Sequence, residues 1–285
     1  MTALLPASRT ADASPSAGTA QAVRLDGIER SFALPRGRRD VLRGIDLHIA
    51  AGEILAVVGP SGCGKSTLLR LVGGLDAPTS GRILLDDIGV ADVDERTAIA
   101  FQEPRLLPWR TIAQNIELGL PRGTARRVGR ERVRELLHLV GLEHAGDQRP
   151  REVSGGMAQR ASLARALARN PGVLLLDEPF GALDALTRLR MHDLLLKIHA
   201  AEPTTILLVT HDVEEALYLA DRVLLLRTLD SSGTGADDDQ SIARTISVPG
   251  VRPRDRADRG LADLRADLLE GLGVDTHHRI TEESR

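Results

Sequence analysis

The feature that most constrains this chain is the glycine-rich segment 59–67, which reads Gly-Pro-Ser-Gly-Cys-Gly-Lys-Ser-Thr. An unbroken apolar run at residues 54–58 precedes it, as in a buried parallel strand, and a leucine-rich, helix-forming run follows it. Glycines between a strand and a helix let consecutive backbone N–H groups and the helix N-terminus surround a polyphosphate. The segment therefore predicts an α/β fold built around a phosphate-binding loop.

Two side chains of this loop carry specific chemistry. Lys65 supplies a compact positive charge to phosphate, and the Ser66 hydroxyl offers the oxygen ligand that Mg²⁺ prefers. Among 37 Lys and Arg residues only Lys65 and Lys197 are lysines, which favours a specific role for lysine in the loop. Kinases, GTPases, recombinases and motor ATPases share such a loop, so other motifs must decide among them.

Composition excludes several classes of protein. At 285 residues the chain suits one main α/β domain with additions, and its net charge of -3 argues against nucleic acid as the main partner. The single cysteine, Cys63, excludes an intrachain disulfide, and in the loop it is better explained as a small side chain than as a redox switch. No apolar run is long enough to span a membrane and no secretory signal pattern is present, so we predict neither.

The stretch before the loop predicts a tail and two strands. Residues 1–20 are mostly Ala, Ser, Thr and Pro and are predicted to be disordered, and strands are predicted at 23–32 and 41–49. The arginine-rich segment 35–40 between the strands is predicted to be a solvated loop. Phe32, one of few aromatic residues, fits either stacking on a nucleobase or packing in the core.

After the loop, strands are predicted at 82–85 and 97–101, and the second ends at Gln102. The carbonyl oxygen of this glutamine can ligate Mg²⁺ or orient a water molecule. Prolines interrupt short helical pieces over residues 103–150, which include an amphipathic helix at 131–140. This stretch is predicted to be a helical insertion whose arginines keep its outer face in water, although a basic surface for a partner also fits.

A second anion-binding helix end is predicted at Ser154-Gly155-Gly156, which leads into a helix-forming run at 161–169. Ser154 is suited to cap the helix, and free N–H groups beside it would face an anion. A second such end raises the question of which phosphate it binds.

Two adjacent carboxylates, Asp177 and Glu178, end the apolar strand predicted at 173–177. Neighbouring side chains of a strand point in opposite directions, so the two can differ in role. Asp177 would hold Mg²⁺ through water, and Glu178 would orient or deprotonate the attacking water. A strand at 205–210 ends at His211, which can hydrogen-bond a phosphate or a water at the same edge.

Farther along the chain, a helix is predicted at 185–199 and edge strands at 222–227 and 243–248, flanking an acidic loop at 230–240. A C-terminal helix is predicted from leucines that share one face, and it fits a docked helix better than a regulatory element. These leucines are Leu261, Leu264, Leu268 and Leu269. The remaining histidines, such as His144, His277 and His278, are predicted to lie at the surface.

In their order, these motifs resemble those of the ATP-binding subunits of ABC transporters, over roughly residues 23–248. Segment 59–67 is similar to the Walker A loop and 173–177 to Walker B. The other matches are Gln102 with the Q-loop glutamine, Ser154-Gly155-Gly156 with the signature motif, Glu178 with the catalytic glutamate, Asp184 with the D-loop, His211 with the switch histidine and Phe32 with the adenine-stacking aromatic.

The resemblance implies the fold, an α/β P-loop ATPase core with a mostly parallel sheet, an N-terminal antiparallel β-subdomain and an α-helical subdomain insertion. It places an ABC ATPase domain at 21–248 after the tail 1–20, with the helical subdomain at 103–165 and a C-terminal helical extension at 249–285. The signature departs from the family at Val153 and Met157, where leucine and glutamine are usual. Because the Ser-Gly-Gly core of the signature is intact, activity is expected.

The resemblance also implies ATP and Mg²⁺ as ligands. Catalytic roles are implied for Glu178, His211 and Gln102. The implied Mg²⁺ ligands are Ser66, Gln102 and Asp177. The implied ATP contacts are Phe32, Gly59, Pro60, Ser61, Gly62, Cys63, Gly64, Lys65, Ser66 and Thr67.

Members of this family pair head to tail, so Ser154, Gly155 and Gly156 would act on ATP held by the partner subunit, and Asp184 is implied as the D-loop residue. The implied assembly is a homodimer of ATPase subunits with two transmembrane permease subunits and a periplasmic or lipoprotein solute-binding protein, at the cytoplasmic face of the inner membrane. No nucleic acid is implied.

Residues 102–109, Gln-Glu-Pro-Arg-Leu-Leu-Pro-Trp, are similar to ATPases of nitrate, taurine and aliphatic sulfonate importers, most of all to the sulfonate form. Trp109 fits either a contact with a membrane subunit or plain packing. The predicted function is the ATPase of an aliphatic sulfonate importer. Alternatives are a taurine or nitrate importer, an exporter or lipid-extraction ATPase, and a soluble mechanical ATPase, although the last usually carries coiled-coil inserts or two fused cassettes.

Overall fold

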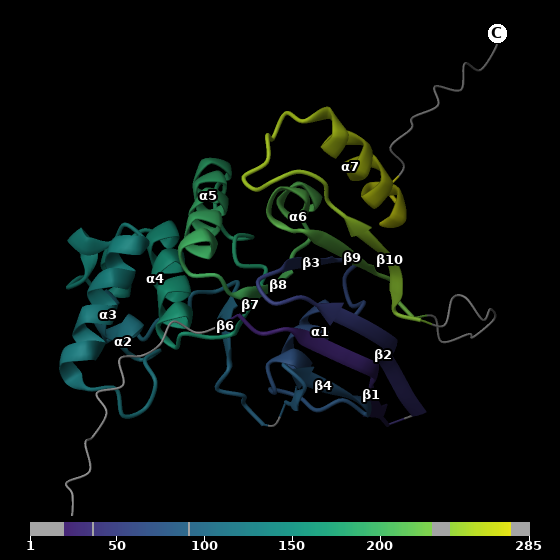
Figure 1. The fold of residues 1–285 in the computed structure, drawn as a ribbon, viewed down its shortest axis with the longest axis horizontal. Coiled ribbons are helices and arrows are strands. Elements are labelled where there is room, and N and C mark those ends of the chain that lie inside the picture. The colour runs from purple at the N-terminus through teal and green to yellow at the C-terminus, as the bar shows by residue number, and fades with distance from the viewer. Residues whose placement is uncertain (1–19, 36, 91, 230–239, 275–285) are drawn as a thin grey trace, which may run out of the picture.

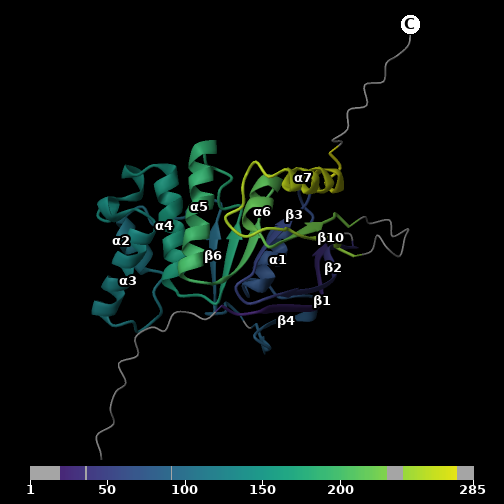
Figure 2. The same cartoon turned by 45° about the horizontal axis from the view of Figure 1, so that its top comes forward.

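The structure is a computed structural model that describes residues 20–35, 37–90, 92–229 and 240–274. Two sheets enclose helix α1 (Lys65–Val72), and further helices cover the opposite face of the larger sheet (Figures 1 and 2). Nearly all of the predicted tail and most of the acidic loop lie outside the described residues.

The larger sheet has the order β10-β9-β3-β8-β7-β6, and its five strands from β9 to β6 run parallel. Alternate residues of its strands face two different cores. In β3, Ile54, Ala56 and Val58 face the helices α4 to α6, whereas Leu55 and Val57 face α1. Such strands are buried on both faces, which is why they are continuously apolar. The strands are β3 (Ile54–Val58), β6 (Thr97–Phe101), β7 (Val173–Asp177), β8 (Thr205–Val209), β9 (Arg222–Leu226) and β10 (Ile242–Ser247).

The smaller sheet is antiparallel, with the order β2-β1-β4-β5. Its strands are β1 (Val23–Leu34), β2 (Gly37–Ile49), β4 (Ser80–Leu85) and β5 (Ile88–Gly89). The prediction of a loop at 35–40 is wrong, because the ladder continues until Leu34 pairs with Gly37. Arg38, Arg39 and Asp40 therefore belong to β2, an edge strand whose polar residues face solvent.

The helical insertion consists of α2 (Ile112–Glu117), α3 (Arg126–Leu139) and the two short 3₁₀ helices Glu143–Ala145 and Pro150–Glu152, and α4 (Gly155–Ala168) joins it to the main sheet (Figure 1). The predicted amphipathic helix at 131–140 is confirmed in α3, which ends one residue earlier, and its apolar face is buried. The residues of that face are Val133, Leu136, Leu137 and the C-cap residue Val140. Together with the two sheets, this layer confirms the predicted fold class.

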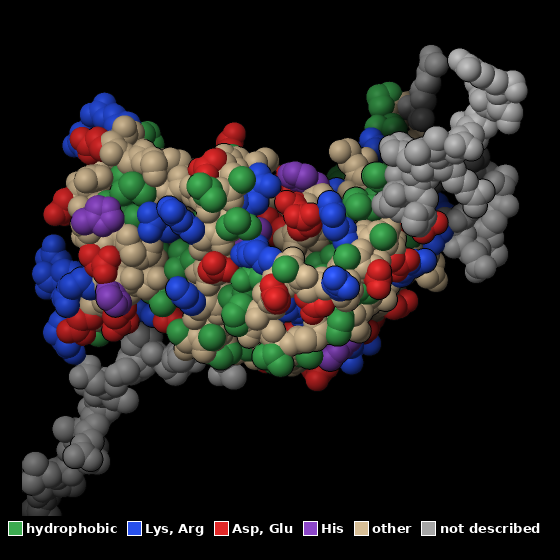
Figure 3. All heavy atoms as spheres, turned by 90° about the horizontal axis from the view of Figure 1, so that it is seen from above, with side chains coloured by type: hydrophobic (Ala, Val, Ile, Leu, Met, Phe, Trp, Pro, Cys, Tyr) green, Lys and Arg blue, Asp and Glu red, His purple; other side chains and the backbone are tan. Residues whose placement is uncertain are grey.

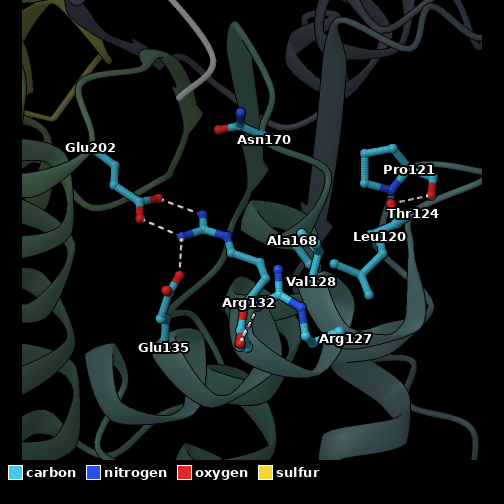
Figure 4. A pocket seen from close by; sticks show the side chains of 11 residues that line it. Leu120, Pro121, Thr124, Arg127, Val128, Arg132, Glu135, Ala168, Asn170 and Glu202 are labelled. Atoms are coloured by element: carbon cyan, nitrogen blue, oxygen red, sulfur yellow. Dashed lines mark hydrogen bonds and ion pairs between the residues drawn. The ribbon is translucent and has the colours of Figure 1, made fainter. Parts of the chain in front are cut away.

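A bidentate ion pair ties α3 to the C-terminal end of α5 (Ala185–Ala201). The Arg132 guanidinium donates to Glu202 Oε1 at 2.6 Å and Oε2 at 2.7 Å, beside a cavity of about 320 Å³ (Figure 4). Its hydrogen bond with Glu202 raises the pKa of Arg132 above its ordinary value. This ion pair attaches the helical layer to α5, and its two residues are 70 positions apart in the sequence.

Strand β9 pairs with β3 on one side and β10 on the other, so the prediction of β9 as an edge strand is wrong and only β10 lies at that edge. The C-terminal helix α7 (Arg259–Gly271) packs on α6 (Val213–Leu219), as Figure 2 shows. Its Leu268 is fully buried, and its other leucines are partly buried against the same core, which confirms a docked helix. Among the described residues, no helix has the length and apolar character needed to cross a bilayer.

Candidate functional site

The phosphate loop joins the central strand β3 to α1, and glycine is required at two of its positions. Gly64 has a φ of 103°, and a Cβ there would lie 2.5 Å from Leu42 Cδ2. A Cβ on Gly59 would lie 2.6 Å from the Leu226 carbonyl oxygen. The Lys65 ammonium donates to the carbonyl oxygens of Gly59 at 2.8 Å and Pro60 at 3.0 Å, so its charge lies across the loop. These contacts define a tight cradle at the N-terminus of α1.

The side chain of Cys63, a residue of this loop, is buried, and burial raises the pKa of its thiol. A raised pKa keeps a cysteine in its unreactive thiol form. A Cβ on Gly59 would lie only 2.7 Å from Cys63 Sγ, so the loop leaves little space around the thiol. A small packing residue is thus favoured over a redox switch.

Three parallel strands bring the predicted catalytic residues to one edge. Phe101, Asp177 and Val209 are paired across β6, β7 and β8. The residues that follow these positions therefore leave the sheet together, and they include Gln102, Glu178 and His211. The register explains why segments far apart in sequence share a site.

Ser66, at the start of α1, donates a hydrogen bond from Oγ to Asp177 Oδ1 at 3.0 Å. Burial raises the pKa of the Asp177 carboxyl, and the hydrogen bond from Ser66 acts in the opposite direction. A cavity of about 280 Å³ adjoins the pair. It is lined by Ser66, Phe101, Gln102, Glu103, Arg105, Asp177 and Glu178.

The predicted Mg²⁺ ligands fit such an ion. A hydroxyl, a carboxylate and an amide oxygen, from Ser66, Asp177 and Gln102, meet at this one cavity. No group of three or more His, Cys, Asp or Glu side chains suited to a metal exists among the described residues. Mg²⁺ is commonly bound by few protein ligands and completed by substrate phosphates and water, which agrees with this sparse set.

Glu178 has a φ of 46°, in the left-handed region that costs a residue with a side chain about 1–3 kcal/mol. Its N–H donates to the Val209 carbonyl oxygen at 2.8 Å, which holds this conformation. Its Oε2 lies 3.2 Å from His211 Nδ1. Gly181 packs beside them, because a Cβ there would lie 3.2 Å from Gln102 Nε2 and 3.6 Å from His211 Cε1. Glu178, His211 and Gln102 therefore form one cluster.

Phe32 lies on β1 with 39% of its surface exposed, so it is not a core residue. The Arg30 guanidinium covers one face of its ring at 4.3 Å from the centroid. Phe32 pairs with Arg39 of β2, whose Nη2 lies 3.7 Å from the position of a Gly62 Cβ. The aromatic ring thus belongs to the strand pair beside the phosphate loop. Arg39 is a neighbour of the loop that sequence reasoning missed, because it was assigned to a solvated loop.

The signature segment lies elsewhere. Ser154 caps α4 by accepting a hydrogen bond from the Met157 N–H at 3.3 Å. A Cβ on Gly156 would lie 2.7 Å from Thr187 Cγ2, so α4 and α5 approach closely at their N-termini. Asp184 caps α5 by accepting from the Thr187 N–H at 3.0 Å. The signature and Asp184 thus share one region.

Ser154 and Gly156 line a groove of about 590 Å³ that shares no lining residue with the cavity at Glu178. The structure therefore does not bring the chain's signature to its own phosphate loop. Val153 and Met157, the two departures from the family pattern, pack against the main core. Both side chains thus contribute to internal packing, and Met157 also lines the groove beside Ser154 and Gly156.

A buried pair behind the site corrects the prediction that the remaining histidines are at the surface. His192 of α5 and Glu215 of α6 are each 3% exposed, and His192 Nε2 lies 3.0 Å from Glu215 Oε2. The ring of Phe180 packs edge-on at 5.1 Å from the His192 ring. His199 is half-buried, His144 is exposed as predicted, and the two C-terminal histidines, at 277 and 278, lie outside the described residues. The residues that neighbour a histidine in a helical sequence do not show whether its side chain will be buried.

Replacing His192 by Leu is expected to destabilise the chain by about 1–3 kcal/mol, because the buried Glu215 side chain would lose its hydrogen-bond partner. Urea unfolding followed by circular dichroism measures this change. The double variant His192→Leu/Glu215→Leu is expected to recover most of the loss, since replacing both members with apolar residues leaves no buried polar group without a partner. A single variant as stable as the wild type would contradict the pairing.

Comparison with known proteins places these motifs in context. A family model described as ABC transporter matches residues 42–181. An aliphatic sulfonates import ATP-binding protein, SsuB 1, of Streptomyces avermitilis is 48% identical, over 94% of this chain and 92% of its own length. SsuB 2 of Burkholderia lata is 50% identical over 83% of this chain and 82% of its own.

Among solved structures, the dimeric post-hydrolysis state of the ATP-binding cassette MJ0796 with ADP and Pi is similar. Its TM-score is 0.68 at 32% identity, and the match covers 80% of this chain and 100% of that cassette. A second structure described as dimeric MJ0796 gives a TM-score of 0.67 at 31% identity. These solved cassettes are dimers.

Proposed function

The chain belongs to the ABC transporter family of ATP-binding proteins, and from this premise we propose that it is the ATP-hydrolysing subunit of an importer of aliphatic sulfonates. The observation that carries the ATPase function is the convergence of Ser66, Asp177, Glu178 and Gln102 on one cavity beside the phosphate loop. Relatives that cover most of the chain at 48–50% identity and are named as sulfonate import proteins support the cargo.

In the proposed reaction, backbone N–H groups of the loop and the Lys65 ammonium bind the phosphates of ATP. Ser66, Asp177 and Gln102 would hold Mg²⁺, which when bound neutralises charge on the phosphate oxygens. Glu178 accepts a hydrogen bond from the attacking water and orients or deprotonates it. His211, whose Nδ1 lies 3.2 Å from Glu178 Oε2, would hold that carboxylate in place and hydrogen-bond the γ-phosphate or the attacking water.

We propose a head-to-tail homodimer. The groove that contains Ser154 and Gly156 is separate from the catalytic cavity of the same chain, and a helix N-terminus with free N–H groups suits a phosphate. Two chains placed head to tail would supply each ATP with one phosphate loop and one signature. Asp184, close to the signature through Thr187, would lie at the same junction.

Membrane partners follow from the proposed importer. Two transmembrane permease subunits and a periplasmic or lipoprotein solute-binding protein would complete it, with this subunit at the cytoplasmic face of the inner membrane. Trp109 is 68% exposed in the segment after Gln102, so a contact with a membrane subunit is favoured over plain packing.

Nucleic acid is not among the proposed partners. On the face seen in Figure 3, Lys and Arg side chains are interspersed with Asp and Glu, and no single-sign patch covers it. The longest described helix, α5, has 17 residues, so the described part of the chain holds no coiled-coil insert of the kind a mechanical ATPase carries. The taurine, nitrate and export alternatives are decided by experiment.

A strain that lacks this gene tests the cargo by growth on single sources of sulfur or nitrogen: an alkanesulfonate, taurine, sulfate or nitrate. We expect failure on the alkanesulfonate alone, with rescue by the wild-type gene. Failure only on taurine or on nitrate would keep the importer and change its cargo. Normal growth on all four sources would contradict the proposed importer.

A further inference from the structure

The guanidinium of Arg165 in α4 donates its hydrogen bonds to backbone carbonyl oxygens and not to a carboxylate. Nη1 donates to the Arg105 carbonyl oxygen and Nη2 donates to the Pro104 carbonyl oxygen, both at 2.8 Å. Burial lowers the pKa of this group, and within the described ranges no acidic side chain forms an ion pair with it. A half-buried cation without a counter-ion is costly unless its hydrogen bonds are well made, so these two contacts are specific.

The carbonyls that Arg165 holds belong to the segment that carries Gln102. Arg105 has a φ of 47°, and its own guanidinium lies 4.3 Å from the centroid of the Phe101 ring. Phe101, Gln102, Glu103 and Arg105 all line the catalytic cavity. The segment thus turns sharply at Arg105, where Arg165 holds its backbone.

A second residue of α4 holds the other end of this segment. Gln159 is 4% exposed, and its Nε2 donates to the Phe101 carbonyl oxygen at 3.2 Å. Side chains of α4 therefore hydrogen-bond the backbone on both sides of Gln102. They contact the carbonyl oxygen of Phe101 before it and those of Pro104 and Arg105 after it. The side chain of Gln102 is exposed and forms no hydrogen bond in the described structure that would orient it. Its direction depends on the backbone that α4 positions.

The same helix begins with the signature. Ser154 caps α4, and Arg165 lies eleven positions later, about 16 Å along a rigid helix at 1.5 Å per residue. A displacement of the signature end of α4 must therefore move the contacts on Pro104 and Arg105. In the proposed dimer, the signature faces ATP held by the partner and Gln102 faces ATP held by its own chain.

We propose that Arg165 is a positioning residue that sets Gln102 in the catalytic cavity according to the position of the signature helix. Through this contact, engagement of the signature at one ATP site is transmitted to the glutamine of the other. The inference rests on the proposed function, since it concerns ATP hydrolysis by the dimer. It assigns to Arg165 no contact with ATP.

The test uses Arg165→Lys, which keeps the charge but replaces the two-pronged guanidinium with a single point of attachment. The full-length chain is assayed for hydrolysis of MgATP, and binding of a fluorescent ATP analogue is titrated separately. We expect kcat to fall about tenfold, because small misplacement of a catalytic group has large effects on rate. The affinity for nucleotide is expected to stay within about twofold, because the phosphate loop is untouched.

The decisive readout is the same substitution in a Gln102→Ala background. If Arg165 acts through Gln102, Arg165→Lys changes kcat by less than about twofold once the glutamine is absent. Equal losses in both backgrounds, or no loss in the wild-type background, would overturn the proposal. Either result leaves the proposed function intact as long as the wild-type chain hydrolyses ATP.

Arg160 provides the matched control. It lies on the same helix, burial lowers its pKa, and it also donates to two backbone carbonyls, at 2.8 Å to Val140 and 3.1 Å to Gly141. Those carbonyls end α3 and do not touch the Gln102 segment. Arg160→Lys is expected to lower stability without the dependence on Gln102, and a similar non-additivity at Arg160 would contradict the specific role of Arg165.

Discussion

Substitution of Glu178 by Gln is expected to lower ATP hydrolysis at least about a hundredfold, the size of effect that a general base supplies. The amide has nearly the same shape but cannot accept the proton of the attacking water. The left-handed backbone of Glu178 is kept by its hydrogen bond to Val209, so the fold should be preserved. In the proposed dimer each ATP lies between two chains, so a variant that binds ATP without hydrolysing it should accumulate as an ATP-bound dimer.

Steady-state phosphate release and size-exclusion chromatography with and without ATP measure the two effects. Glu143→Gln is the control, since Glu143 is an exposed carboxylate of the helical layer that interacts with His138 and His144 and lines no part of the catalytic cavity. It should hydrolyse ATP at the wild-type rate and remain monomeric after turnover. Full hydrolysis by Glu178→Gln would remove Glu178 from the role of general base.

The second large effect concerns the division of each ATP site between two chains. Lys65→Ala removes the charge that is proposed to bind phosphate, and Ser154→Glu places a negative charge where the signature is proposed to face the phosphate of the partner's ATP. The glutamate is compatible with the N-terminus of α4, because a negative side chain is favourable at that end of a helix dipole. Each variant alone should therefore fold and lose hydrolysis about a hundredfold.

An equal mixture of these two variants should regain about a quarter of the wild-type rate, because half of random pairs are heterodimers with one intact site of two. The intact site combines Lys65 of one chain with Ser154 of the other. A mixture of two differently tagged Lys65→Ala chains is the control and should stay inactive. Recovery no greater than in that control would contradict the head-to-tail dimer.

The sequence was sufficient for those parts of the fold that depend on local pattern. Strands at 54–58, 97–101 and 173–177 match the observed strands because a parallel strand covered on both faces must be apolar throughout. The clustering of Gln102, Glu178 and His211 could be predicted because each ends a parallel strand. Their mutual distances could not, since they depend on the register between strands.

The errors have physical causes of the same kind. The residues 38–40 are polar because β2 is an edge strand, and a polar edge strand cannot be told from a loop by composition. β9 lies inside the sheet because strand order does not follow chain order. The contact of His192 is with Glu215, 23 positions away. The contact of Arg165 is with the backbone of the Gln102 segment, about 60 positions away. No local pattern reports such contacts.

The most direct measurement of the central claim is uptake of a radiolabelled alkanesulfonate by cells that lack this gene. The cells are complemented with the wild-type chain or with Glu178→Gln. The account predicts that the wild type restores uptake, that Glu178→Gln does not, and that uptake of nitrate is the same in all strains. Uptake that is normal without the gene, or fully restored by Glu178→Gln, would contradict a sulfonate importer driven by ATP hydrolysis at Glu178.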